Sequence, residues 1–419
     1  MATRIQRTQG TGTSTKKFTF SGWIKKTSNT TSNDQVVFES NNDSNNRITV
    51  YFRGSTNNTF NIYGASSGSQ IINIETTRLF RDVSAWYHIV VAVDTTQGTA
   101  ADRIKIYVNG TQETAFNTST YPSQDSNLPI GSSSYTNTVG YYLHGGSSAF
   151  DGVMSHLHYT DGYTYAASDF GSTNSTTGEW QINTSPNVTY GNNGFFWLKD
   201  DVSTTDHSPN SNTFTVSTGT LTKTEDCPSN VFATFNPLMK NSNINLQNGN
   251  TSIRPQANSI DFQAGSTLAF SSGKYYAEFK YLENDGHQMY GISTTEGASE
   301  LLRNLQFTGQ TATSVAIYAS NGSVYENNSA SSYGSGFANN AIIMMAVDAD
   351  NNKIYFGSNG TWYNSGNPSS GTNGYSFNAT NLAGFKYMVT GNGTIGYDNT
   401  DANFGNGYFG TTAVSSAGT

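Results

Sequence analysis

AVDTTQGTAADRIKIYVNGT at residues 92–111 and AVDADNNKIYFGSNGT at residues 346–361 are two versions of one phrase. In each, Ala-Val-Asp ends an apolar run of strand length, and the β-branched residues of the first run disfavour a helix. Ile104, Ile106 and Val108 then alternate with Lys and Tyr, which places the apolar side chains on one face of a strand. Asn-Gly supplies the positive φ angles of a tight turn. The phrase predicts strand, loop, strand and turn, twice in one chain.

The composition favours an all-β protein of two domains. The chain has 419 residues, of which 12% are charged and 13% aromatic, with 42 Gly and 8 Pro. Twenty-five Tyr and 24 Phe supply enough apolar surface for packed cores, and Gly-, Asn- and Ser-rich turns separate short strands. A chain of this length exceeds one compact core, so two domains are expected.

The charge and hydropathy patterns exclude several classes of protein. The formal net charge is −8, and the 21 basic residues form no dense cluster, so we expect no nucleic-acid partner. No apolar run approaches the ~20 residues that cross a bilayer, so we expect no membrane insertion. The start MATRIQRTQG lacks the apolar segment of a signal peptide. Cys227 is the single cysteine, and an internal disulfide is therefore excluded.

Strand-like segments gather around both copies of the phrase and leave an irregular stretch between them. The segments recur at roughly ten-residue intervals, which is the spacing of a β-sandwich or jelly roll. We predict a first sandwich over residues 1–182, a structured linker over 183–249 and a second sandwich over 250–419. Half of the prolines fall in the linker. Its expected packed residues are Phe195, Phe196, Trp197, Phe232 and Phe235.

Particular motifs in both halves resemble known families. FTFSGWIKK, SAWYHIVVAVD, IKIYVNGTQ and FDGVMSHLHYTDG resemble the laminin-G-like (concanavalin A-like) jelly roll. SSGKYYAEFKYLE, YGIST, AVDADNNKIYFGSNGTW and a closing NFG resemble a SPRY-type sandwich. Both families are variants of one topology. The resemblance implies two concanavalin A-like jelly-roll β-sandwiches joined by a structured linker, with the repeated phrase as the same hairpin in both.

A more specific resemblance covers residues 18–409. YHIVVAVDTTQ, YGNNGFFWLKDD, DHSPNSNTF and CPSNVFATFNP are similar to virion proteins of tailed bacteriophages, especially marine ones. The resemblance implies a non-enzymatic structural protein on the virion surface, made in the host cytoplasm and placed as a head decoration or in a tail fibre or spike. Its expected partners are other phage structural proteins, further copies of itself in a symmetric assembly, and a host cell-surface glycan.

An enzyme of this fold would need paired carboxyl groups. Retaining glycosidases hold two of them about 5 Å apart across the sugar, and in this fold a Glu-x-Asp-x-(x)-Glu strand supplies them. That pattern is missing from the sequence. Glu278 and Glu283 are an odd number of residues apart, so a regular strand sends them to opposite faces. We therefore expect no enzyme; the alternative is a glycan-cleaving depolymerase with acids from separate strands.

Two groups of residues are candidates for a metal. His156 and His158 lie two apart on one predicted strand, so their side chains are expected on the same face. The alternative is a polar outer face of that strand. The laminin-G resemblance implies calcium at rim acids, for which Asp94 and Asp151 are candidates. The alternative for Asp94 is a loop-capping residue at a strand end. The expectation is no cofactor, with calcium as the alternative.

Aromatic residues beside Asn and Ser predict carbohydrate-binding loops. Sugar binding needs aromatic platforms for the apolar sugar face and polar groups for hydroxyls, carried on exposed loops. Trp362 stands out because it follows a tight Asn-Gly turn. The alternative is that these rings pack between loops or subunits. The candidate ligand-binding residues are Tyr141, Tyr163, Tyr325, Tyr333, Trp362 and Tyr363.

Overall fold

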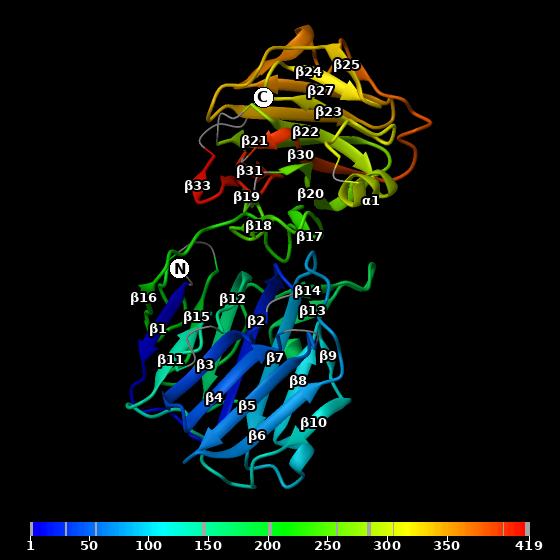
Figure 1. Ribbon diagram of the computed structural model, residues 1–419. Coiled ribbons are helices and arrows are strands. Elements are labelled where there is room, and N and C mark those ends of the chain that lie inside the picture. The colour runs from blue at the N-terminus through cyan, green and yellow to red at the C-terminus, as the bar shows by residue number, and fades with distance from the viewer. Residues whose placement is uncertain are drawn as a thin grey trace. The chain divides into compact units, whose positions relative to one another are not determined.

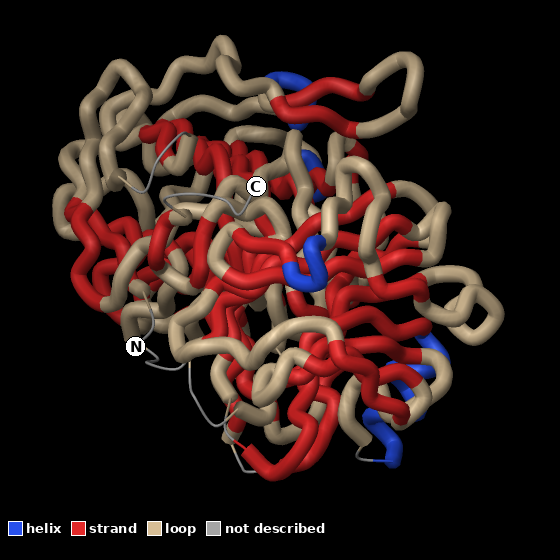
Figure 2. Tube along the Cα trace, turned by 90° about the horizontal axis from the view of Figure 1, so that it is seen from above, coloured by secondary structure: helices blue, strands red, loops and turns tan. Residues whose placement is uncertain are grey.

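The computed structural model divides into two compact units, each built almost entirely from strands. One unit is Met1–Lys223 with Cys227–Ser229, and the other is Thr224–Asp226 with Asn230–Thr419. Figure 2 shows strand segments throughout and few short helices. The residues that the structure describes are 3–29, 32–54, 57–144, 148–199, 203–256, 259–282, 286–304, 306–396 and 398–414. Glu283 of the sequence analysis lies outside these residues.

The first unit contains two large antiparallel sheets (Figure 1). The eight strands of sheet 1A are, in spatial order, β10 (Phe116–Thr120), β6 (Ser69–Thr76), β5 (Phe60–Ser66), β4 (Asn46–Phe52), β3 (Gln35–Asp43), β11 (Thr136–Val139), β1 (Arg4–Thr8) and β16 (Thr215–Thr218). The six strands of sheet 1B are β15 (Phe195–Trp197), β12 (Gly152–Asp161), β2 (Lys17–Lys26), β7 (Tyr87–Asp94), β8 (Ile104–Val108) and β9 (Thr111–Gln112). The smaller elements are β13 (Gly171–Thr173), β14 (Trp180–Ile182), η1 (Ala100–Asp102) and η2 (Ala167–Asp169).

The core of the first unit lies between sheets 1A and 1B. Successive side chains of a strand alternate between its faces, so each strand contributes every second residue. On β8, Ile104, Ile106 and Val108 are buried in this core, as the sequence predicted. Sheet 1A contributes residues such as Ile48 and Val50 of β4 to the same core. Two apolar sheet faces packed on each other make this unit a β-sandwich.

The second unit repeats the two-sheet plan. The seven strands of sheet 2A are β17 (Phe235–Lys240), β20 (Ser259–Phe270), β30 (Lys386–Gly396), β22 (Gln288–Thr294), β23 (Ser314–Tyr318), β24 (Ser323–Glu326) and β25 (Ser329–Ser332). Sheet 2B contains β18 (Ile244–Gln247), β19 (Ser252–Pro255), β31 (Thr400–Asn403), β21 (Lys274–Tyr281), β26 (Ile342–Asp348), β27 (Lys353–Ser358) and β28 (Thr361–Trp362), with β29 (Tyr375–Ser376) also paired to β27. The remaining elements are α1 (Thr295–Asn304), η3 (Tyr363–Ser365), β32 (Tyr408–Phe409) and β33 (Thr412–Ala413).

The helix α1 covers the outer face of sheet 2A. Thr294 caps it, because its side-chain oxygen accepts a hydrogen bond from the N–H of Gly297 at 3.0 Å. Ala298 and Leu301 bury their side chains against Val389 of β30. Within the described residues α1 is the single α-helix, and none of their helices is long and apolar enough to span a membrane.

The repeated phrase forms the same hairpin in both units. β7 pairs with β8 and β26 pairs with β27, and a two-residue turn follows the second strand of each pair. The turn residues Asn109 and Gly110 have φ angles of 47° and 81°, and Asn359 and Gly360 have 49° and 83°. These angles are those of a tight hairpin turn, as the Asn-Gly pairs predicted.

The Lys-Ile-Tyr tripeptides of the two copies, by contrast, differ in their register against the preceding strand. Ala346 lies opposite Tyr355, whereas the equivalent Ala92 lies opposite Lys105. The second copy is therefore offset by two residues within its strand. Because side chains alternate with period two, a shift of two keeps the tyrosine of each copy on the outer face.

Each turn asparagine also ties the hairpin together. In the first unit the N–H of His88 donates to Asn109 Oδ1 at 2.8 Å, and the N–H of Asn109 donates to the carbonyl of His88 at 2.9 Å. Ile342 and Asn359 make the same two bonds in the second unit, both at 2.9 Å. Asparagine thus supplies both the left-handed backbone and a side-chain acceptor.

The predicted linker is not a separate part of the structure, because the chain passes from the first unit to the second near residue 223. β15 and β16 extend sheets 1B and 1A, and β17 and β18 belong to the sheets of the second unit. Phe195 and Trp197 lie in the first core and Phe235 in the second. The short strands of residues 183–249 bury these rings by completing the sheets, and their Pro-rich surroundings hid the strand pattern.

Replacing Asn359 tests the double role of the turn. Asn359→Ala loses the side-chain acceptor and replaces asparagine, which tolerates a positive φ, with alanine, which does not, so we expect β26–β27 to lose about 2 kcal/mol of stability. Asn359→Gly loses the acceptor alone and is expected to cost about 1 kcal/mol. Native-state hydrogen exchange of the β26 and β27 amides gives both values. Equal losses in the two variants would contradict the part assigned to the backbone angle.

Candidate functional site

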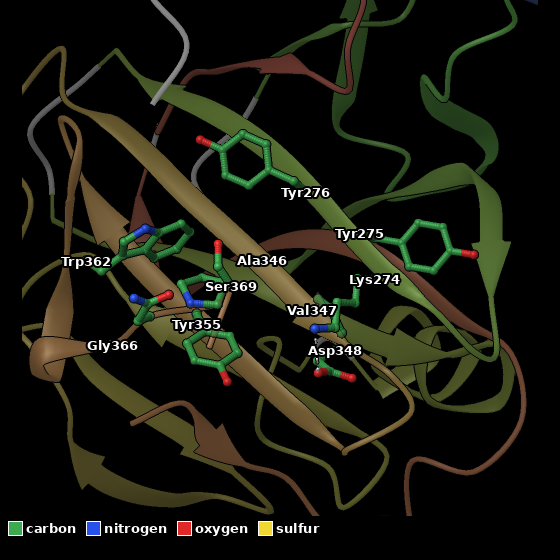
Figure 3. A pocket seen from close by; sticks show the side chains of 12 residues that line it. Lys274, Tyr275, Tyr276, Ala346, Val347, Asp348, Tyr355, Trp362, Gly366 and Ser369 are labelled. Atoms are coloured by element: carbon green, nitrogen blue, oxygen red, sulfur yellow. Dashed lines mark ion pairs between the residues drawn. The ribbon is translucent and has the colours of Figure 1, made fainter. Parts of the chain in front are cut away.

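A groove of about 550 Å³ lies on the outer face of sheet 2B (Figure 3). Its residues come from β21, β26, β27, β28 and the loop that follows η3. The lining residues are Lys274, Tyr275, Tyr276, Ala346, Val347, Asp348, Tyr355, Trp362, Gly366, Asn367, Pro368 and Ser369. This volume is within the range of small-molecule sites, about 300–1,000 Å³.

Strand alternation places the side chains of the groove floor. Ala277 and Phe279 of β21 point into the core, which leaves Tyr276 on the outer face. Tyr276 lies opposite Ala346, and Ala346 lies opposite Tyr355, so the three form one row across the sheet. The small side chain of Ala346 between two tyrosines leaves the hollow that becomes the groove.

Trp362 closes one end of this row. It belongs to the two-residue strand β28, which the turn at Asn359 and Gly360 folds back along β27. Its ring centroid lies 6.2 Å from that of Tyr276, with the ring planes at 69°. Tyr276 is 40% exposed and Trp362 is half-buried. The two rings therefore form an accessible aromatic corner rather than a flat platform.

The wall of the groove is the loop of residues 366–374, here called the wall loop. Lys353 Nζ donates a hydrogen bond to the carbonyl of Gly371 at 2.6 Å, and Tyr333 Oη donates to the carbonyl of Asn373 at 3.3 Å. The backbone of the loop also closes on itself, because Asn367 and Thr372 exchange two hydrogen bonds. These bonds hold the loop in one position over the sheet.

Tyr355 lies directly beneath the wall loop. A β-carbon at Gly374 would stand 2.5 Å from its ring, so glycine is needed at this contact. The ring is buried, and within the described residues its hydroxyl has no hydrogen-bond partner. A buried polar group without a partner costs about 1–3 kcal/mol, and such groups are found at functional sites.

An ion pair stands at the other end of the groove. Lys274 Nζ lies 3.6 Å from Asp348 Oδ2, the interaction drawn as a dashed line in Figure 3. Asp348 also accepts hydrogen bonds from the N–H and the side-chain amide of Asn351. Burial alone would raise the pKa of Asp348, but these bonds and Lys274 outweigh it and lower the pKa below its usual value.

A buried carboxylate supports Tyr276 from the side. Tyr276 Oη donates to Glu278 Oε1 at 2.8 Å, and Asn403 Nδ2 donates to Glu278 Oε2 at 3.3 Å. Burial and the neighbouring carboxylate raise the pKa of Tyr276 well above its usual value. The hydroxyl is therefore neutral and fixed in direction, which holds the ring in place.

The structure brings one of the predicted aromatic residues, Trp362, to the groove. Tyr333 is buried and holds the wall loop, and Tyr363 stacks on Phe337 with centroids 5.7 Å apart. Tyr325 packs edge-on against Phe307 and Tyr318. In the first unit, Tyr141 lies under the guanidinium of Arg4, and Tyr163 is exposed.

Lys274, Tyr276 and Tyr355 were missed by the sequence analysis, which searched loops. Their signal is the alternation in KYYAEFKY, where an outward-facing Tyr sits in a strand whose other face is apolar. A solvated sheet face normally carries polar residues. Outward aromatic residues on neighbouring strands would therefore have been the feature to look for.

The equivalent face of the first unit is covered. Lys17 pairs with Asp94 as Lys274 pairs with Asp348, so Thr19 takes the place of Tyr276. Thr19 Oγ1 donates to the carbonyl of Tyr163 and accepts from the N–H of Tyr165. A cover formed by residues 163–190 thus lies where the groove lies in the second unit. Its apolar contacts with sheet 1B involve Val90, Tyr107, Tyr165, Ala167, Phe170, Trp180 and Val188.

The histidines predicted as metal ligands lie near this cover. A β-bulge between Ser155 and His158, with His156 at a φ of 48°, interrupts the regular alternation of this strand. Both histidine rings nevertheless contact Phe196, with centroids 5.7 Å and 4.0 Å from it. His158 is buried, stacks on Phe196 at 4.0 Å and contacts Tyr190 Oη at 2.9 Å. His156 contacts Ser155 Oγ.

The acids proposed for calcium lie in separate settings. Asp94 accepts hydrogen bonds from Thr96 and Gln97 and pairs with Lys17 at 3.1 Å. Burial raises its pKa, but these partners prevail and lower it to about 2. Asp151 is exposed just before β12. Among the described residues no group of three or more His, Cys, Asp or Glu is placed to hold a metal.

A third histidine, His88, is the centre of the layer under the cover. Its ring stacks on Trp23 with centroids 4.9 Å apart and faces Trp180 at 5.9 Å. Trp180 Nε1 donates to His88 Nδ1 at 2.9 Å, so the ring proton sits on Nε2 and donates to Ser21 Oγ. Burial lowers the pKa of His88 to about 3.

Comparisons with known proteins agree with a concanavalin A-like domain at the N-terminus. Residues 3–167, less than half of the chain, match the model of the concanavalin A-like lectin/glucanases superfamily. No curated protein matches the sequence. The chain is similar in structure to the SPRY domain of human HERC1, with 16% identity, a TM-score of 0.32, and coverage of 40% of this chain and 96% of that one. For the PSpry domain of TRIM65 the values are 15%, 0.31, 41% and 88%.

The buried His88 predicts a loss of stability at mildly acidic pH. The unfolded state takes up a proton below about pH 6.5, whereas the folded state does so only near pH 3. The free energy of unfolding is therefore unaffected by the titration of His88 above pH 6.5. Below that pH it decreases as the pH falls, by up to about 1.4 kcal/mol per pH unit. His88→Gln keeps one donor and one acceptor but does not titrate.

The measurement is the difference in free energy of unfolding between this variant and the wild type, from pH 6.5 to 5. A difference is needed because burial raises the pKa of Glu39 in sheet 1A to about 7, and that group acts in the opposite direction. We expect the wild type to lose stability relative to the variant as the pH falls. A difference that does not change with pH would show that His88 is accessible to protons in the folded state.

Proposed function

We propose that this chain is a non-enzymatic structural protein on the outside of a phage particle, and that the groove on sheet 2B binds a surface glycan. The observation that carries the binding part is the accessible aromatic corner of Tyr276 and Trp362 beside a charged pair. Sugars present an apolar C–H face and a rim of hydroxyls, and such a ligand needs both kinds of contact.

The aromatic corner suits a sugar ring. The planes of Tyr276 and Trp362 meet at 69°, so a pyranose lying on one ring has its edge against the other. Ala346 beneath them leaves room for the ring to approach the sheet. Burying apolar area at about 25 cal/mol per Å² makes this contact the main source of affinity.

Polar groups around the aromatic corner can orient a bound sugar by hydrogen bonding to its hydroxyl groups. Asn367 and Ser369 on the wall loop, with Lys274 at the far end, offer donors and acceptors to hydroxyl groups. The hydrogen bonds of the wall loop form without a ligand, so little ordering is left to be done on binding. A preformed site binds more tightly because this cost is avoided.

The alternative, a depolymerase, needs two carboxyl groups facing one sugar. Asp348 is the one acid among the residues that line the groove, and Glu278 lies buried behind Tyr276. This arrangement favours binding over cleavage. The readout that separates the two is the release of reducing ends from a bound polysaccharide.

The virion location rests on the sequence resemblance of the strands and of residues 183–249 to phage virion proteins. A concanavalin A-like domain is compatible with carbohydrate binding. In this proposal the chain contacts other phage structural proteins and assembles symmetrically with copies of itself. A symmetric array presents many weak glycan sites at once, which raises the overall affinity by avidity.

Filling the groove or removing its aromatic wall tests the binding site. Trp362→Ala removes one ring, and Ala346→Leu fills the hollow while both rings stay. We expect each to weaken binding to glycans on intact host cells at least tenfold, equivalent to about 1.4 kcal/mol. Flow cytometry with labelled full-length protein measures the binding.

Two controls complete this test. Phe385→Ala removes an exposed ring of the same unit outside the groove and should bind as the wild type does. Ala346→Ser keeps the small volume and should also bind. Unchanged binding by Ala346→Leu, with a normal melting temperature, would refute the groove as the glycan site.

The virion location is tested on particles of the phage that encodes the chain. Antibodies raised against the second unit should label intact particles in electron micrographs, at the head or at a tail appendage. Purified particles that lack the protein by mass spectrometry would contradict the location and leave the groove proposal to its own test.

A further inference from the structure

The three charged side chains at the groove differ in their access to solvent. The side chain of Lys274 is 59% exposed, whereas that of Asp348 is 4% exposed. Glu278, which lies behind Tyr276, is 1% exposed. A ligand in the groove therefore meets one formal charge that reaches solvent, and this charge is positive.

Both acids are already engaged. Asp348 accepts from the backbone and the side chain of Asn351 at 3.1 and 3.0 Å. Glu278 accepts from Tyr276 Oη and Asn403 Nδ2. Their negative charge is thus directed into the protein, and it opposes an incoming anion less than two exposed carboxylates would.

Lys274 has weaker interactions within the protein than either acid has. Its Nζ lies 3.6 Å from Asp348 Oδ2, a longer contact than an ordinary hydrogen bond, and most of the side chain is exposed. An ammonium group carries three donors. Lys353, the next cation in the same row, donates to the carbonyl of Gly371 in the wall loop.

Lys274 is also placed at the right distance from the aromatic corner. Lys274 and Tyr276 lie two residues apart on β21 and share one face. This spacing corresponds to about 7 Å along the strand, the scale of one sugar unit. An anionic substituent on the stacked sugar or on the next one is within reach of the ammonium group.

We infer that the groove selects acidic glycans, with the sugar ring in the corner of Tyr276 and Trp362 and its carboxylate on Lys274. This inference rests on the proposed glycan binding and names the ligand class. The protein as a whole carries a formal charge of −8, so general attraction of acidic polymers is not the cause. The preference arises from one exposed cation beside an aromatic contact.

The test uses three acidic polysaccharides, alginate, polygalacturonate and hyaluronate, each beside its carboxyl-reduced, neutral form. Titration calorimetry with the full-length chain measures the affinities. We expect at least one acidic polymer to bind, and its neutral form to bind about tenfold more weakly. Lys274→Ala should lose this preference, and Lys274→Arg should keep it. Lys280→Ala is the matched control on the same strand, outside the groove.

Each outcome bears on the inference. A wild type that binds no acidic polymer, binds both forms equally, or keeps its preference in Lys274→Ala overturns it. If the neutral forms bind and Trp362→Ala abolishes that binding, glycan binding stands and only the acidic selectivity fails. If no polymer of either form binds and intact host cells are not bound either, both proposals fail.

Discussion

The period of two in an antiparallel hairpin is the constraint on which the structure depends. In both units the hairpin after Ala-Val-Asp sends every second side chain into a sandwich core, and the core fixes the register. The intervening side chains are thereby forced onto an outer face. Whatever chemistry the protein displays on sheets 1B and 2B must be carried by these positions.

The two units use this outer face in different ways. In the first unit, residues 163–190 cover the outer face, and the side chain of Thr19 makes its hydrogen bonds with this cover. In the second unit, Tyr276 occupies the equivalent place and remains 40% exposed beside Trp362. The wall loop lies over Tyr355, and Tyr276 and Trp362 line the groove together with it. The same outer face is therefore covered in the first unit and lines a groove in the second.

The sequence was sufficient for the fold because alternation and Asn-Gly turns are local signals. The sequence was less informative where contacts between residues that are distant in the chain determine the local structure. The bulge at His156 depends on pairing with β2, which no local pattern reveals. β15 and β16 are recognisable as strands only through the sheets that they complete. Trp362 was found because its turn is local, whereas Tyr276 and Lys274 become site residues only when β26, β28 and the wall loop lie beside them.

The central claim is that a sugar sits on the open outer face of the second unit. The most direct measurement is an experimental structure of the full chain with an acidic oligosaccharide that it binds. The account predicts density for a sugar ring against Tyr276 and Trp362, with its carboxylate next to Lys274 Nζ. Sugar density on the first unit or on rim loops, with the groove empty, would contradict it.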